Sequence, residues 1–216
     1  MPRSLSDKVL ASTSGDIDSI RNHILDAALR VIHTEGLAAA STRAIATEAG
    51  IAAGTLYNYF GDRLQLLAQT IMRRVRLLSQ NVTDVALQAG QGSVAGNLQA
   101  FVSHSAVVLN ELVPLIASVF SDTELLNALR NEMASAETAF NPDHQLEQYL
   151  LAERELGRIA TDTDCSAVAS MVVSICHDRA FHRYLSGDTR KEKPNLKEID
   201  FIADALTRRA SHQRKD

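Results

Sequence analysis

The sequence predicts an all-α protein in which a short three-helix N-terminal domain is joined to a larger helical domain. Apolar residues recur at spacings of three and four along most of the chain, which is the period of an amphipathic helix. The interruptions between these segments are glycine, proline and asparagine, which are residues that end helices. No pair of alternating apolar and polar segments indicates a strand pair.

The first helix is expected to begin at Ser19. Residues 1–18 are rich in Ser, Asp and Gly, and this composition predicts a disordered extension. The helix that follows has apolar positions such as Ile20 and Ile24, and Gly36 is its stop signal.

Two short helices and one long helix are predicted next. Ser41 is a good N-cap for a helix over Thr42–Ala49, which ends at Gly50. A second short helix is expected over Ala53–Tyr59, after only a few connecting residues. Asp62 is expected to cap the longer helix that follows.

The remainder of the chain is also expected to be helical. Gly90 to Gly92, Pro114, Asn141-Pro142, Gly157 and the loop 187–195 mark the expected breaks. They predict further helices at 93–111, 112–120, 122–140, 143–156, 164–186 and 196–210.

The composition is that of an ordinary globular protein, with 45% hydrophobic and 22% charged residues. No run of 18 apolar residues indicates a membrane span, and Met1–Ser19 has no apolar segment of a secretion signal. Two cysteines, Cys165 and Cys176, do not form a disulfide framework. These features predict a cytoplasmic protein without a membrane partner.

Charge is distributed unevenly along the chain. The formal net charge is −4, yet residues 21–76 carry seven arginines against four acidic residues, a local charge of +3. The rest of the chain is therefore acidic. This asymmetry is expected if only the N-terminal part meets the phosphates of a nucleic acid.

The segment from Ser41 to Phe60 reads STRAIATEAGIAAGTLYNYF. Ile45, Ile51 and Leu56 can close a small core, and Gly50 allows a left-handed turn between two short helices. The outward positions then carry hydroxyls, an amide and one arginine, which suit a wet polyanionic groove.

Residues 20–67 resemble the DNA-binding domain of the tetracycline-repressor (TetR/AcrR) family. The resemblance rests on Thr42, Ile45-Ala46, Ala49-Gly50 and the stretch Gly54-Thr55-Leu56-Tyr57-Asn58-Tyr59-Phe60, all at matching spacing. It implies a helix-turn-helix domain over 19–66, a helical regulatory and dimerisation domain over 67–210, and a flexible tail over 211–216.

The position of each residue in this motif implies the following DNA-contacting residues: Thr42, Arg43, Ala53, Gly54, Thr55, Tyr57, Asn58, Tyr59 and Arg63. Two positions depart from the family pattern. Ala52 stands where the family has a capping Ser or Thr, which costs about 0.5–2 kcal/mol of capping. Arg63 stands where the family has lysine, and arginine can still bind phosphate.

The resemblance also implies a ligand pocket and a dimer interface. Phe101, His104 and Val108 share one face of the helix near 93–111 and are candidates for contact with a small, mainly apolar effector. The last two helices carry apolar stripes for a homodimer: Val168, Met171, Val172, Ile175, Ile199, Ile202 and Leu206.

These features predict a transcriptional repressor that binds palindromic double-stranded operator DNA as a dimer and is released by a small molecule. No nucleophile elbow, phosphate loop, dinucleotide fingerprint or zinc-ligand spacing is found, so neither an enzyme nor a metal or cofactor site is expected. The alternative is a helical ligand-binding protein of the same fold that acts as an activator or has lost DNA binding.

Overall fold

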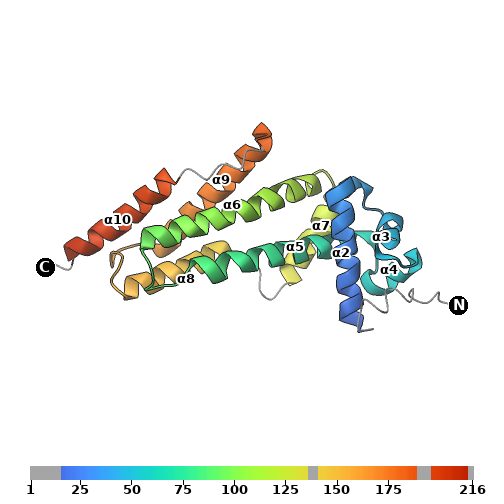
Figure 1. The fold of residues 1–216 in the computed structure, drawn as a ribbon, viewed down its shortest axis with the longest axis horizontal. Helices are drawn as coiled ribbons and strands as arrows, with labels where there is room; N and C mark the ends of the chain where they lie inside the picture. The colour runs from blue at the N-terminus through green and yellow to red at the C-terminus, as the bar shows by residue number, and fades with distance from the viewer. Residues whose placement is uncertain (1–15, 136–140, 189–195, 214–216) are drawn as a thin grey trace. The chain divides into compact units, whose positions relative to one another are not determined.

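The structure is a computed structural model that describes residues 16–135, 141–188 and 196–213. Within these ranges the chain forms nine α-helices and one 3₁₀ turn, and it contains no strand (Figure 1). The all-α prediction is therefore confirmed. The elements in chain order are α2 (Ile17–Glu35), η1 (Leu37–Ala39), α3 (Thr42–Ala49), α4 (Ala53–Phe60), α5 (Arg63–Ala86), α6 (Val94–Val119), α7 (Thr123–Ser135), α8 (Pro142–Glu155), α9 (Cys165–Ser186) and α10 (Lys197–Gln213).

One expected break is absent. Pro114 lies inside α6, so the separate helices expected at 93–111 and 112–120 are one helix. Proline in a helix interior removes a hydrogen bond and costs about 3 kcal/mol. Leu112 before it and Val119 after it are both buried, and this packing keeps the helix continuous. The prediction of a break was wrong because it considered only the local effect of proline and not the tertiary contacts of the helix.

Several ends also differ from the expected bounds. Helix α2 begins at Ile17, two residues earlier than expected, and α10 continues to Gln213, into the segment that was expected to be a flexible tail. Residues 1–15, 136–140 and 214–216 lie outside the described residues, and with them lie the rest of the predicted extension, the end of the predicted helix 122–140 and the rest of the tail.

The chain divides into two compact units. One contains residues 1–76 and 115–139, and the other contains residues 77–114 and 140–216. The predicted helix-turn-helix domain, 19–66, is thus part of a larger unit that includes α7. The reason is a shared core, because Leu125 and Leu129 of α7 belong to the same buried cluster as the side chains of α2 to α5.

The second unit has its own buried residues, contributed by α6, α8, α9 and α10. Those that are essentially inaccessible to solvent include Leu98, Phe101, Leu146, Leu150, Val172 and Ile199. By length and composition alone α6 could cross a membrane. It also carries the polar residues Asn97, His104 and Glu111, and it buries Leu98 and Phe101.

Candidate nucleic-acid interface

Local backbone chemistry positions α3 and α4 next to each other. Ser41 Oγ accepts a hydrogen bond from the amide of Ala44 at 3.1 Å, which caps the start of α3 as predicted. Gly50 ends α3 in the left-handed region, with φ 67° and ψ 31°. The next amide, of Ile51, bonds to the carbonyl of Ala46 at 2.9 Å. The chain then enters α4 after a short turn, which is the arrangement of a helix-turn-helix.

The two faces of α4 have different roles. Leu56 and Phe60 are 1% and 2% exposed and belong to the core of the unit. The opposite face is open to solvent and carries Ala53, Gly54, Tyr57 and Asn58. Thr55 and Tyr59 are half-buried at the border between the two faces.

The two tyrosines of α4 are not equivalent. Tyr57 is exposed, whereas Tyr59 packs against the buried core cluster. Two residues that lie two positions apart cannot share one face of a helix. Of the pair, Tyr57 is the more accessible to a ligand outside the protein.

The start of α4 lacks a side-chain cap. Ala52 occupies the N-cap position with an extended backbone, and no side chain accepts from the first amides of the helix. Gly54, two residues further along, has open space around it: apart from the neighbouring backbone of its own helix, a Cβ built there meets no protein atom within 4 Å. The fold itself therefore does not require a glycine at this position.

Many arginines of the N-terminal unit are engaged within the protein. Arg30 forms an ion pair with Glu48 at 2.6 Å, and Arg73 pairs with Asp26. Arg63 donates from Nε to the carbonyl of Ala40 at 2.9 Å. The positive charge of this segment is thus used in part to join α2, α3 and α5, and not only for an external partner.

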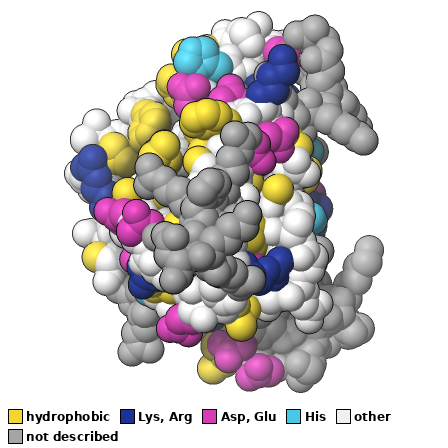
Figure 2. Space-filling model, turned by 90° about the vertical axis from the view of Figure 1, so that its left-hand side faces the viewer, with side chains coloured by type: hydrophobic (Ala, Val, Ile, Leu, Met, Phe, Trp, Pro, Cys, Tyr) yellow, Lys and Arg dark blue, Asp and Glu magenta, His cyan; other side chains and the backbone are white. Residues whose placement is uncertain are grey.

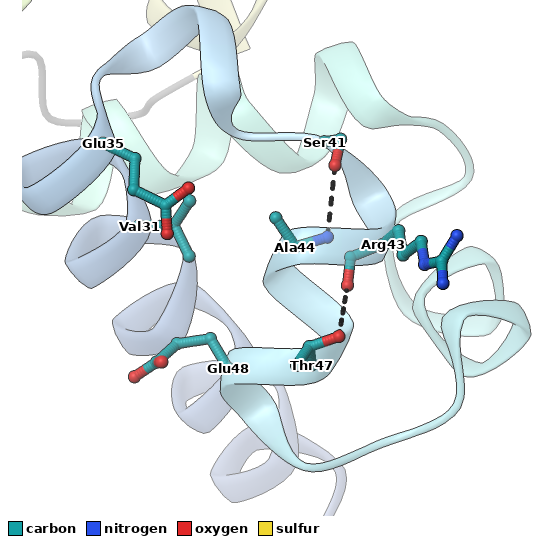
Figure 3. A pocket seen from close by; sticks show the side chains of 7 residues that line it. All are labelled: Val31, Glu35, Ser41, Arg43, Ala44, Thr47 and Glu48. Carbon is teal, nitrogen blue, oxygen red and sulfur yellow. Dashed lines mark hydrogen bonds between the residues drawn. The ribbon is translucent and has the colours of Figure 1, made fainter.

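Arg43 is exposed like Arg30, but among the described residues its side chain forms no ion pair. Figure 3 shows it pointing away from α2, while Glu48 of α3 points toward α2, which ends at Glu35. These side chains line a hollow of about 360 Å³ between α2 and α3, together with Val31, Ser41, Ala44 and Thr47. Because two carboxylates line the hollow, a polyanion is expected to approach from the α4 side of Arg43.

The predicted effector residues lie on α6 of the second unit. Phe101 and Val108 are buried, and the half-buried His104 places Nδ1 2.7 Å from the carbonyl of Ala100 on its own helix. Among the described residues, no group of three or more His, Cys, Asp or Glu side chains could hold a metal ion.

Sequence reasoning missed a buried polar cluster in the second unit. Glu153 is 0% exposed, and its carboxylate lies 3.3 Å from Nη1 of Arg158. Asn97 donates to the hydroxyl of Tyr149 at 3.0 Å, and burial raises the pKa of that tyrosine. No sequence signal singles out Glu153, since a glutamate at a helical position is normally exposed.

The predicted interface residues fall into two groups. Val172, Ile199, Ile202 and Leu206 are buried within the protomer, while Met171 is exposed and Val168 and Ile175 are half-buried. A helix that packs on its own protomer uses its apolar stripe for that contact, so the four buried residues serve the core. Large exposed hydrophobic side chains of the same two helices are Met171, Phe181, Tyr184, Leu185 and Phe201.

The face of the molecule seen in Figure 2 has a mixed character. Acidic and basic side chains of the described residues are scattered there among hydrophobic ones.

The N-terminal segment is similar to the corresponding segment of known proteins. The family model for bacterial regulatory proteins of the tetR family matches residues 24–70, the range that contains α3, α4 and every predicted DNA-contacting residue. The HTH-type transcriptional repressor KstR of Rhodococcus jostii is 38% identical over 78 residues, which are 33% of this chain and 37% of KstR. The chain thus spans little more than a third of that relative.

A longer but weaker match is the HTH-type transcriptional regulator SrpR of Pseudomonas putida, 24% identical over 147 residues and 67% of each chain. Two solved structures share the fold over most of the chain. A tetR-family regulator of Mesorhizobium loti aligns with a TM-score of 0.62 and 21% identity, covering 91% of this chain and 97% of that one. FadR of Bacillus subtilis, in complex with stearoyl-CoA, aligns with a TM-score of 0.58 and 18% identity, covering 87% and 98%.

Proposed function

This chain belongs to the tetR family of bacterial regulatory proteins, and we propose on that premise that it is a dimeric transcriptional repressor that binds a palindromic operator. The observation that carries the proposal is the open face of α4, which exposes Gly54, Tyr57 and Asn58 beside the exposed Arg43 of α3. The similarity to a repressor, KstR, favours repression over activation.

The chemistry of this face suits DNA. Asn58 can pair bidentately with an adenine edge, and Arg43 can bind a phosphate or a guanine. Gly54 lets the backbone of α4 approach the groove closely, since no side chain projects there. Thr42, Ala53, Thr55, Tyr59 and Arg63 complete the proposed contact set.

Dimerisation supplies the second half-site. One helix-turn-helix buries little surface, and two copies bind half-sites about 34 Å apart. The exposed side chains of Met171, Phe181, Tyr184, Leu185 and Phe201 support an interface on α9 and α10. Val168 and Ile175, which are half-buried, can contribute to its edge.

The effector is proposed to bind within residues 77–180, near Phe101, His104 and Val108 of the second unit. The structural neighbour FadR was solved with stearoyl-CoA, which supports a mainly apolar ligand such as an acyl chain. The protein releases DNA if the ligand prefers a state of the dimer in which the two α4 helices are spaced differently. A decisive shift needs a preference of about 10⁴-fold for that state.

A second candidate is a protein of this fold that binds a ligand and has lost DNA binding or acts as an activator. The uncapped start of α4 at Ala52 favours it, because the capping residue of this helix is absent. In either case we expect the protein to act in the cytoplasm, where the DNA or a metabolite ligand is found.

The experiment is selection of duplexes by the wild-type protein from a random-sequence pool, followed by anisotropy titration of the selected duplex. A palindromic consensus and a log–log salt slope of about −0.9 per phosphate contact are expected. Arg43→Ala should weaken binding while the circular dichroism spectrum stays unchanged. Failure to enrich any sequence, with binding of all duplexes equally weak, would contradict the repressor and favour the form of the second candidate that has lost DNA binding.

A further inference from the structure

Arg21 of α2 holds the C-terminal end of α4. Its Nη1 donates a hydrogen bond to the carbonyl of Tyr59, and the guanidinium lies 4.6 Å from the centre of the Phe60 ring. A cation at this place satisfies a carbonyl that has no partner inside the helix and complements the negative end of the helix dipole. Stacking on the buried Phe60 adds a cation–π contact. Arg21 therefore fixes the end of the helix that is proposed to read DNA.

Arg21 does not act alone, because a chain of hydrogen bonds continues from it. Its Nη2 donates to Oε1 of Gln69 on α5 at 2.6 Å, and Nε2 of Gln69 donates to Oε1 of Glu132 on α7 at 3.1 Å. Only one orientation of the Gln69 amide fits both neighbours, because its oxygen must face the guanidinium and its nitrogen must face the carboxylate. The three side chains thus form an ordered series of cation, amide and carboxylate.

Helix α7 follows the helix-turn-helix by more than 60 residues in the sequence, but it belongs to the same compact unit. Leu125 and Leu129 of α7 share the buried cluster with Leu56 and Phe60 of α4. The series of hydrogen bonds from Arg21 to Glu132 therefore joins helices of one compact unit, and a displacement of α7 relative to α5 would break its last hydrogen bond.

We propose that Arg21, Gln69 and Glu132 form a relay that positions the end of α4, so that Glu132 on α7 is a positioning residue for DNA binding. The inference rests on the proposed function, because it assumes that α4 contacts DNA. It adds an element outside the helix-turn-helix whose placement sets the affinity of the recognition helix.

The test swaps the donor and the acceptor of the hydrogen bond between Gln69 and Glu132. In Gln69→Glu a carboxylate still accepts from Arg21, but it faces the carboxylate of Glu132. We expect the affinity for the duplex selected by the wild-type protein to fall about tenfold, as for a coupling of about 1.4 kcal/mol. Adding Glu132→Gln supplies an amide that donates to the new carboxylate, and the double variant should recover most of the loss.

The matched control combines Gln69→Glu with Glu124→Gln. Glu124 is exposed on the same helix, so this pair makes the same charge change without rebuilding the relay. It should not recover the affinity. Arg21→Lys is the milder variant, since lysine keeps the cation but cannot serve two acceptors in one planar fork. Its affinity should fall about fivefold, the value of one net hydrogen bond.

A purely structural role is separated from positioning by two readouts. All titrations are made at a temperature where circular dichroism shows each variant fully folded, so lost stability alone does not change the affinity. Amide hydrogen exchange of α4, measured without DNA, should be faster in Gln69→Glu and return toward the wild-type rate in the Glu132→Gln double variant.

The outcomes separate the relay from the proposed function. Wild-type affinity in Gln69→Glu and Arg21→Lys, or equal recovery by Glu124→Gln, would overturn the relay while DNA binding stands. If the wild-type protein selects no duplex, the proposed function fails. The relay is then tested only by the amide hydrogen exchange of α4. Unchanged exchange of the α4 amides in Gln69→Glu would then overturn it.

Discussion

Arg63, the first residue of α5, donates a hydrogen bond from Nε to the backbone carbonyl of Ala40, 2.9 Å away. Ala40 is completely buried, so solvent does not reach this residue. The bond joins the start of α5 to the segment that leads into α3. Arg63 therefore stabilises the helix-turn-helix, in addition to any contact that its remaining nitrogens make with phosphate.

Replacing Arg63 by methionine should lower the free energy of unfolding by about 1–3 kcal/mol, because a buried carbonyl loses a charged donor. Denaturant unfolding followed by circular dichroism measures the change. Arg76→Met is the control, since Arg76 is exposed. Equal destabilisation by both substitutions would show that the hydrogen bond to Ala40 does not contribute to the free energy of unfolding.

The two tyrosines of α4 should separate binding from stability. Tyr57→Ala removes an exposed side chain and should weaken DNA binding while changing the unfolding free energy by less than about 0.5 kcal/mol. Tyr59→Ala removes a side chain packed on the core and should cost about 2 kcal/mol of stability. The reverse order of the two stability effects would contradict the placement of the rings.

Two neighbouring residues of α10 should separate dimerisation from folding. Phe201 is 76% exposed, whereas Ile202 is 8% exposed. Phe201→Asp should produce a folded monomer, because the charge enters only the proposed interface. Ile202→Asp should lower the stability of the protomer itself, because it buries an unpaired charge. Sedimentation velocity and thermal unfolding of both variants measure this, and an intact Phe201→Asp dimer would place the interface elsewhere.

Both cysteines should be unreactive in the native protein. Burial raises the pKa of Cys176 to about 11, against the opposing hydrogen bond with Ser105, and burial also raises the pKa of Cys165. At pH 8 only about one Cys176 in a thousand is then a thiolate, the reactive form. At pH 8 a thiol reagent should modify both residues far more slowly in the folded protein than after unfolding, and the rate for folded Cys176 should rise as the pH approaches 11. Rapid labelling of the folded protein at pH 8 would contradict this.

Local features of the fold could be predicted from the sequence, because the residues that cause them are neighbours in the chain. The cap at Ser41 and the left-handed Gly50 were expected, and so was Asp62, whose Oδ1 accepts from the amide of Gln65 at 2.8 Å. The two side-chain caps each bond to an amide three residues later, so the capping residue itself predicts the start of the helix.

Features that depend on distant partners could not be predicted. The bond between Gln69 and Glu132 joins residues 63 positions apart, and the ion pair of Glu153 depends on a fold that buries it. The apolar stripes of α9 and α10 showed which faces are buried, but periodicity does not say whether the covering surface is the same protomer or a second copy. Val172 and Ile199 illustrate this, because both pack inside the protomer.

The central claim, that α4 meets DNA closely at its N-terminal end, is tested by comparing Gly54→Ala with Ala52→Ser. Both substitutions should stabilise the protein by up to about 1 kcal/mol, the first through helix propensity and the second through a new N-cap. On the selected duplex their effects should be opposite, because the Cβ at position 54 has room in the protein but not against a groove. We predict that Gly54→Ala weakens binding about tenfold, as for one lost contact, whereas Ala52→Ser binds at least as tightly as wild type. Wild-type affinity in a stabilised Gly54→Ala variant would contradict the account.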